Sequence, residues 1–213
     1  MRKNNGLFDQ LITELQHGLN TCHVRPPQHE RPYPGRSVTD SELSEQEQAQ
    51  VAGLMRVNNA GEVAAQGLYR GQALTARNAA VSASMAEAAE EENEHLNWCQ
   101  QRLSELNASR SKLDGLWYWG SFAIGSLAGA VGDRWSLGFV EETEKQVCKH
   151  LESHLQKLPE KDQRSRAILE AMQTDEKRHA ENAHKAGAAE LPMPVKKTMT
   201  LVSKLMTFSA YRL

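Results

Sequence analysis

Two Glu-x-x-His sequences interrupt the apolar faces of two predicted helices, and this feature restricts the fold more than any other. On a helix, the spacing places a carboxylate and an imidazole on one face, about one turn apart. Glu92 and His95 form the first pair, and Glu176 and His179 form the second. The apolar residues that share these faces are Met85, Ala88, Leu96, Cys99 and Leu103 in the first helix and Ile168, Leu169, Met172 and Ala183 in the second. Because an inward carboxylate is costly unless it is paired or binds a metal ion, both helices are predicted to pack around a shared polar centre.

Two further Glu-x-x-His sequences do not have this inward phase. Glu181, which is paired with His184, shares its face with basic residues and is predicted to be solvated. Glu14 and His17 lie opposite the apolar stripe of a short N-terminal helix. We therefore exclude both pairs from the predicted centre.

A two-metal carboxylate bundle needs one more glutamate on each of two other helices, and the sequence supplies both. Glu62 lies in the middle of a predicted helix, where Ala60 and Gly61 allow another helix to approach closely. Glu141 is predicted to face inward from a further helix, with Glu144 as the alternative ligand. Four carboxylates neutralise two divalent ions and two neutral imidazoles complete the set, so the cluster can lie in an apolar core.

A polar network that bridges the helices without an ion is the competing interpretation. Such a network explains one isolated pair, but it predicts nothing about the other two helices. Oxygen and imidazole donors favour iron or manganese, because structural zinc sites favour thiolates. Cys99 and Cys148 lie close to predicted ligands and are interpreted as packing residues of the core.

The chain is predicted to be all-α, and we find no segment of useful length with the period of a strand. Capping boxes at Thr39 or Ser44 begin the first long helix, and one at Ser84 begins the second. Pro159 suits the first turn of the fourth long helix, and Gly187 suits its end. The predicted helices span residues 7–19, about 41–77, about 84–107, 133–157, 159–186 and 195–210.

The composition fits one helical domain. The chain of 213 residues is long enough for one core, with residues 1–40 predicted as an N-terminal helix and Pro-rich linker and residues 41–213 as the metal-binding domain. A formal charge of −2 leaves no basic excess, which argues against a surface that binds nucleic acid and so against nucleic-acid partners. Three widely spaced cysteines argue against a disulfide framework, and the first residues resemble neither a secretory signal nor a transit peptide.

Five short motifs follow one another along the chain: RVNNAGE (56–62), GLYRGQ (67–72), ENEH (92–95), VEE (140–142) and DEKRH (175–179). In this order they closely resemble the demethoxyubiquinone hydroxylases of ubiquinone biosynthesis. The resemblance runs from about residue 44 to the C-terminal Arg-Leu. It implies a ferritin-like fold with two iron ions per chain, held by six ligands. Those ligands fall on the positions predicted above, and the family pattern favours the first glutamate of VEE, Glu141.

The resemblance also implies a reaction, the hydroxylation of a demethoxyubiquinol ring with O2. It implies peripheral attachment to a membrane, which we place at the cytoplasmic face of a bacterial-type cell membrane. Arg56 and Tyr69 are candidates to support the ligands from outside. Eukaryotic members carry His-His where this chain has Val147-Cys148, and His150 or His154 is an alternative source of such a histidine.

The sequence leaves open which donor supplies the electrons and which overall role the protein has. No G-x-G-x-x-G follows a strand, so the electrons are expected from NADH in direct contact, from the quinol or from a reductase. Iron oxidation and storage, as in ferritins, would use the same six ligands. A non-enzymatic helical membrane protein with a structural metal is the third hypothesis. A homo-oligomer or a biosynthetic complex is compatible with the hydroxylase.

Two apolar segments, 115–131 and 195–213, are predicted to attach the protein to a membrane. The first is uncharged but contains four glycines, and Trp117, Tyr118 and Trp119 suit the headgroup region. We interpret it as a helix that lies in the interface, with a core helix or a membrane span as alternatives. The second combines basic residues with Leu, Met and Phe, and its alternative is a fifth helix that closes the bundle.

Overall fold

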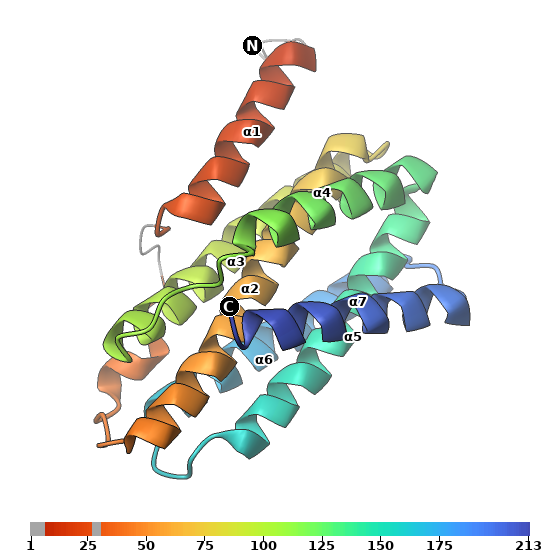
Figure 1. The fold of residues 1–213 in the computed structure, drawn as a ribbon. Helices are drawn as coiled ribbons and strands as arrows, with labels where there is room; N and C mark the ends of the chain where they lie inside the picture. Colours follow the sequence, from red (N-terminus) through yellow and green to blue (C-terminus); the bar gives the residue numbers. More distant parts are fainter. Residues whose placement is uncertain (1–6, 27–30) are drawn as a thin grey trace.

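Helices are the regular elements of the part of the chain that the structure describes. The computed structural model describes residues 7–26 and 31–213, which form seven α-helices, a short 3-10 helix and no strand (Figure 1). In chain order the elements are α1 (Leu7–His23), η1 (Pro34–Ser37), α2 (Glu45–Thr75), α3 (Ala79–Glu105), α4 (Asp114–Val131), α5 (Asp133–Lys157), α6 (Gln163–Lys185) and α7 (Met193–Ala210). The bundle consists of α2, α3, α5 and α6, while α1, α4 and α7 pack around it (Figure 1). The all-α prediction is confirmed, whereas the division at residue 40 stays a prediction.

Polar side chains decide where the bundle helices begin. Ser44 caps α2 with both hydrogen bonds of a capping box, as predicted. The start of α3 lies before the predicted Ser84, because the side chain of Asn78 accepts a hydrogen bond from the first turn. The start of α6 lies after Pro159, because Asp162 caps it in the same way. Each error concerns a helix end and leaves the inward faces unchanged.

The core of the bundle consists of two apolar layers separated by a polar one. One layer contains Met55, Trp98, Cys99, Leu103, Leu151, Ile168, Leu169 and Met172. The other contains Tyr69, Met85, Ala89, Leu137, Val140 and Ala183. On α2, α3, α5 and α6 alike, a buried glutamate lies between the residues of the two layers. The inward faces predicted for α3 and α6 are therefore confirmed.

The backbone of α4 lies directly against that of α2. A Cβ atom at Gly67 of α2 would overlap the carbonyl group of Tyr118, and one at Gly125 of α4 would overlap the carbonyl group of Leu68. No side chain fits at either position, so glycine is required there by the close approach. Several large apolar residues on the other side of α4 are exposed, among them Leu116, Leu127 and Val131.

The outer helices also expose apolar side chains. A polar side of α1 faces the bundle, where Glu14 pairs with Arg70 of α2 at an Oε2–Nε distance of 2.7 Å. Its apolar stripe is exposed and consists of Phe8, Leu11, Ile12, Leu15 and Leu19. None of the helices that the structure describes is long and apolar enough to cross a membrane.

Candidate metal centre

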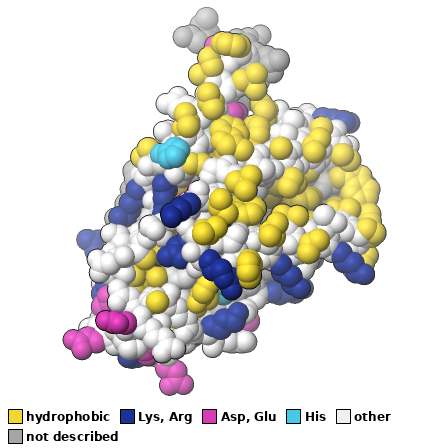
Figure 2. Space-filling model, viewed as in Figure 1, with side chains coloured by type: hydrophobic (Ala, Val, Ile, Leu, Met, Phe, Trp, Pro, Cys, Tyr) yellow, Lys and Arg dark blue, Asp and Glu magenta, His cyan; other side chains and the backbone are white. Residues whose placement is uncertain are grey.

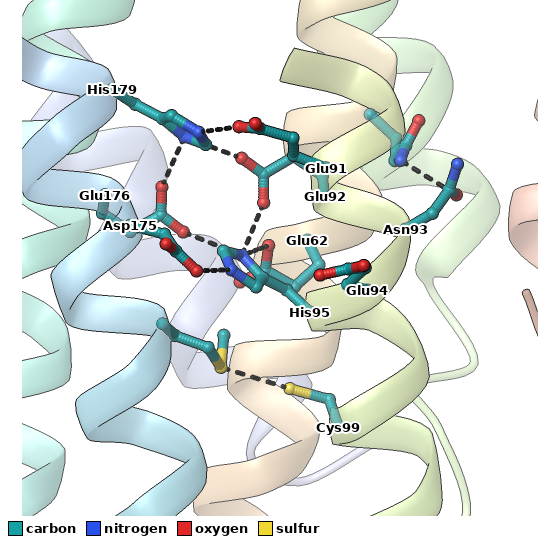
Figure 3. A network of polar contacts seen from close by, with 12 residues as sticks. Glu62, Glu91, Glu92, Asn93, Glu94, His95, Cys99, Asp175, Glu176 and His179 are labelled. Atoms are coloured by element: carbon teal, nitrogen blue, oxygen red, sulfur yellow. Dashed lines mark hydrogen bonds and ion pairs between the residues drawn. The ribbon is translucent and has the colours of Figure 1, made fainter. Parts of the chain in front are cut away.

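Four side chains from three helices meet in the polar layer. Glu62 of α2, Glu92 and His95 of α3 and Glu176 of α6 are all buried, and one ligand atom of each lies within 4.8 Å of the others (Figure 3). Their positions follow from helical phase, because each replaces an apolar residue on an inward stripe. The structure thus brings together four of the six predicted ligands in one group.

The fifth predicted ligand, His179, joins the group through two carboxylates. Its Nδ1 atom lies 3.2 Å from Oε1 of Glu92 and 3.2 Å from Oε2 of Glu176. The other oxygens of the same two carboxylates lie near Nδ1 of His95, at 2.8 Å for Glu92 and 3.2 Å for Glu176. Glu92 and Glu176 therefore stand between two imidazoles, as carboxylates that bridge two metal ions do.

The structure does not bring Glu141 into this group. Its carboxylate pairs with Lys145 and with His184, whose Nδ1 lies 3.2 Å from Oε1. The buried glutamate of α5 is Glu144, which is 2 % exposed and accepts a hydrogen bond from the hydroxyl of Tyr69. The reason is the phase of α5, whose buried stripe runs through Leu137, Val140, Glu144 and Leu151.

The two residues predicted to support the ligands, Tyr69 and Arg56, lie in different parts of the structure. Tyr69 is fully buried and touches Glu144, so it lies against the polar layer as expected of a supporting residue. Arg56 donates hydrogen bonds to the carbonyl oxygens of Ser109 and Tyr211, at 2.9 and 3.0 Å. It therefore ties α2 to the C-terminal end of the chain.

Each ligand histidine is held from outside by an acid of the opposite helix. Nε2 of His95 lies 3.0 Å from Oδ2 of Asp175, and Nε2 of His179 lies 2.6 Å from Oε2 of Glu91 (Figure 3). Both rings thus direct Nδ1 toward the group and Nε2 away from it, an arrangement that orients metal-binding histidines. We did not predict these acids. The signal for them is that each one directly precedes the Glu of a Glu-x-x-His pair.

Raised pKa values favour bound protons at several groups of this polar layer. Burial raises the pKa of Glu62 and of Glu144 well above the usual range of a carboxyl group. Burial opposes a charge on His95, but Glu92 and the other carboxylates raise its pKa well above the usual value. Against the same burial, hydrogen bonds that the ring donates to the carboxylates of Glu176 and Glu92 raise the pKa of His179 to about 12. Metal ions would take the place of these protons and of their charge.

The donor set fits two divalent ions. The buried group offers carboxylate oxygens and imidazole nitrogens, which suit iron or manganese better than zinc. The nearby thiol of Cys99 lies 3.8 Å from the sulfur of Met172 and packs in the core, as predicted. Four buried glutamates can balance the charge of two such ions, so the structure is compatible with the metal site that the sequence predicts.

The comparisons with known proteins agree with this geometry. The family model described as Ubiquinone biosynthesis protein COQ7 matches residues 49–210. The chain belongs to this family. A relative from Nitrosospira multiformis is 52 % identical over 204 residues, which cover 96 % of this chain and 98 % of the relative. One from Chromobacterium violaceum is 52 % identical over 206 residues, which cover 97 % of this chain and 100 % of the relative. One from Xanthomonas oryzae pv. oryzae is 53 % identical over 206 residues, which cover 97 % of this chain and 94 % of the relative. All three are named 3-demethoxyubiquinol 3-hydroxylase.

In this member of the COQ7 family, a cavity of about 500 Å³ leads to the polar layer. Glu62, Glu92, Glu144 and Glu176 line it, and its walls include apolar residues of α4 and α7. The apolar wall residues include Val57, Leu68, Trp117, Ile124, Phe139, Val147, Leu151, Val195, Met199, Val202 and Met206. The cavity therefore joins the buried carboxylates to helices that expose apolar side chains.

Proposed function

We propose that this chain hydroxylates the ring of a demethoxyubiquinol with O2 in ubiquinone biosynthesis. The observation that carries the proposal is the cavity, which combines apolar walls with four carboxylates. An aromatic ring with a polyprenyl tail matches such a cavity, because most of its surface is apolar. The names of the relatives, which cover almost the whole chain, support the choice of ring.

We propose two iron ions per chain as the cofactor. The proposed ligands are Glu62, Glu92, His95, Glu144, Glu176 and His179. Glu144 takes the place that the sequence suggested for Glu141, because its carboxylate is buried against Tyr69 while that of Glu141 pairs with Lys145. Two ferrous ions held by these residues would supply the electrons that activate O2.

The protein side chains hold the ring and the ligands in place. The walls from α4 and α7 exclude water from the cavity, which strengthens every electrostatic interaction inside it. Tyr69 donates its hydroxyl hydrogen to Glu144 and so fixes the direction of that carboxylate. The electrons that restore the ferrous state are proposed to come from NADH, from the quinol or from a reductase.

We propose that α1, α4 and α7 rest on the cytoplasmic face of the cell membrane. Figure 2 shows hydrophobic side chains gathered over these helices on one face, with lysines and arginines beside them. Exposed residues of α7 include Leu201, Leu205 and Phe208 next to Lys197 and Lys204, a combination that suits an anionic lipid surface. A substrate with a polyprenyl tail can pass from such a surface into the cavity.

The reaction is tested with labelled oxygen. Reduced, iron-loaded protein that receives demethoxyquinol and ¹⁸O₂ is expected to give a product with one ¹⁸O atom in a new ring hydroxyl. Mass spectrometry of the product measures it. Label from water alone, or iron oxidation without a ring product, would contradict the proposal and favour a ferritin-like role. Absence of O2 uptake would favour a structural metal.

Membrane attachment is tested by placing charge on the exposed face. Replacing both Leu127 and Leu205 by Glu is expected to weaken binding to anionic liposomes at least about tenfold, since each leucine contributes ~1.5–3 kcal/mol when buried. Liposome flotation measures the bound fraction. Thr174→Glu, on an exposed position of α6, adds charge elsewhere and should leave binding unchanged. Equal binding of all variants would exclude this face.

A further inference from the structure

The linker between α1 and α2 reaches the outer side of the metal centre through Arg31. Its Nη1 lies 2.6 Å from Oδ2 of Asp175, and its Nε lies 3.3 Å from Oε2 of Glu94. The backbone N–H of Arg31 donates to the other oxygen of Glu94, at 3.2 Å. The guanidinium also lies over the ring of Trp98, 4.8 Å from its centroid. The three side-chain contacts and the backbone contact fix Arg31 in place, although its side chain is 41 % exposed.

Asp175 connects this arginine to a metal ligand. The oxygen that receives Nη1 of Arg31 is also the one that lies 3.0 Å from Nε2 of His95. When Nδ1 of His95 binds a metal ion, Nε2 keeps its hydrogen and donates it to Asp175. A carboxylate in this position makes the imidazole a stronger electron donor to the metal. A cation on the same oxygen weakens that effect.

We propose that Arg31 is a positioning residue that sets the reduction potential of the iron bound by His95. It holds Asp175 in place and takes up part of its negative charge, which makes the ferric state less favourable. The inference rests on the proposed iron centre, but it does not depend on the substrate. It assigns a role to a linker that lies outside the region matched by the family model.

The second ligand histidine lacks this connection to the linker. His179 is held by Glu91, and Glu91 pairs with Arg178, which belongs to α6 itself. Arg178 also reaches Asp175, but at Oδ1, 3.3 Å away. Among the described residues, Arg31 is the cation that binds the oxygen facing His95. Its effect should therefore fall on one half of the centre.

The test is a reductive titration of the full-length, iron-loaded protein. The loss of ferric absorbance monitors the titration. Arg31→Gln is expected to favour the ferric state about tenfold at the more affected iron, which is ~59 mV toward negative potential for one electron. Arg31→Lys keeps the charge and is expected to recover most of the shift. Arg36→Gln removes the same charge from an exposed position of the same linker and should change nothing.

A double substitution separates this role from a merely structural one. Asp175→Asn is expected to shift the potential in the positive direction, because the carboxylate is lost. Adding Arg31→Gln to that variant should have no further effect, since the two residues act in series. Equal potentials in Arg31→Gln and Arg36→Gln, an Arg31→Lys value that matches Arg31→Gln, or additive shifts would overturn the proposal. Failure to hydroxylate a quinol would leave this measurement unaffected.

Discussion

Replacing Glu144 by alanine is expected to abolish ring hydroxylation and to remove one iron ion from each chain. The carboxylate is buried between Tyr69 and the group that contains Glu92 and Glu176, so the ion on that side would lose a ligand. Turnover should fall by more than about 100-fold, the upper end of the loss seen when only an outer partner of a metal ligand is removed. Iron analysis and turnover of the purified variant measure both effects.

Glu141→Ala is the matched control, because it removes the same carboxylate from the same helix, three residues earlier. Glu141 pairs with Lys145 and His184 and not with the buried group, so its loss should leave two iron ions bound. If Glu141→Ala loses iron while Glu144→Ala retains it, the motif alone identifies the ligand and the phase that we assign to α5 is wrong. Glu144→Gln, which keeps the shape of the side chain, guards against misfolding.

Replacing Glu176 by alanine is expected to remove both iron ions. The two oxygens of this carboxylate lie 3.2 Å from Nδ1 of His95 and 3.2 Å from Nδ1 of His179, so neither half of the centre is complete without it. Among the described residues, Glu62 pairs with His95, at 3.6 Å between Oε2 and Nδ1, and not with His179, so its loss should be less severe. Turnover of the Glu176 variant should lie at the background rate. Iron per chain is the direct measurement.

The control for this variant is Glu181→Ala, on the same helix. The side chain of Glu181 is 69 % exposed and pairs with Lys185, so the variant should bind two iron ions and turn over normally. Two iron ions in the Glu176 variant would exclude a bridging role for this carboxylate. Loss of iron in the Glu181 variant would show that the helical phase of α6 differs from the one described.

Much of the centre could be predicted from the sequence, because its ligands follow local rules. The Glu-x-x-His spacing fixes two side chains on one face of a helix, and the apolar neighbours show that the face is buried. This reasoning placed Glu92, His95, Glu176 and His179 correctly on inward faces. Glu62 followed from the need for a further carboxylate on another helix, and it is buried in the same group.

The glutamate of α5 could not be chosen from the sequence with the same certainty. Acidic residues lie close together there, and Glu141 has apolar neighbours at helical spacing, including Leu137 and Cys148. Cys148 is only partly buried, however, and the buried stripe passes through Glu144 and Leu151. Which side of α5 faces the bundle depends on how α6 and α4 pack on it. That packing is tertiary information, so local spacing cannot supply it.

The outer partners of the histidines and the orientation of α1 were missed for a similar reason. Glu91 and Asp175 hold histidines of a different helix, and no spacing within one helix predicts such a contact. The apolar stripe of α1 was predicted, but its exposure was not. It is exposed because Glu14 of α1 pairs with Arg70 on the bundle, which turns residues such as Phe8 outward.

The glycine contacts between α2 and α4 divide the positions of α4 into two classes of mutational tolerance. At Gly125, even the methyl group of alanine would meet the backbone of α2, so a substitution there must push the whole helix away. At Leu127, two residues later, the side chain is 69 % exposed and can change without moving the backbone. The outer face of α4 can therefore diverge between lineages, and on the proposed membrane surface it could adapt to different lipids. The inner face keeps the wall of the cavity at a constant distance from the carboxylates.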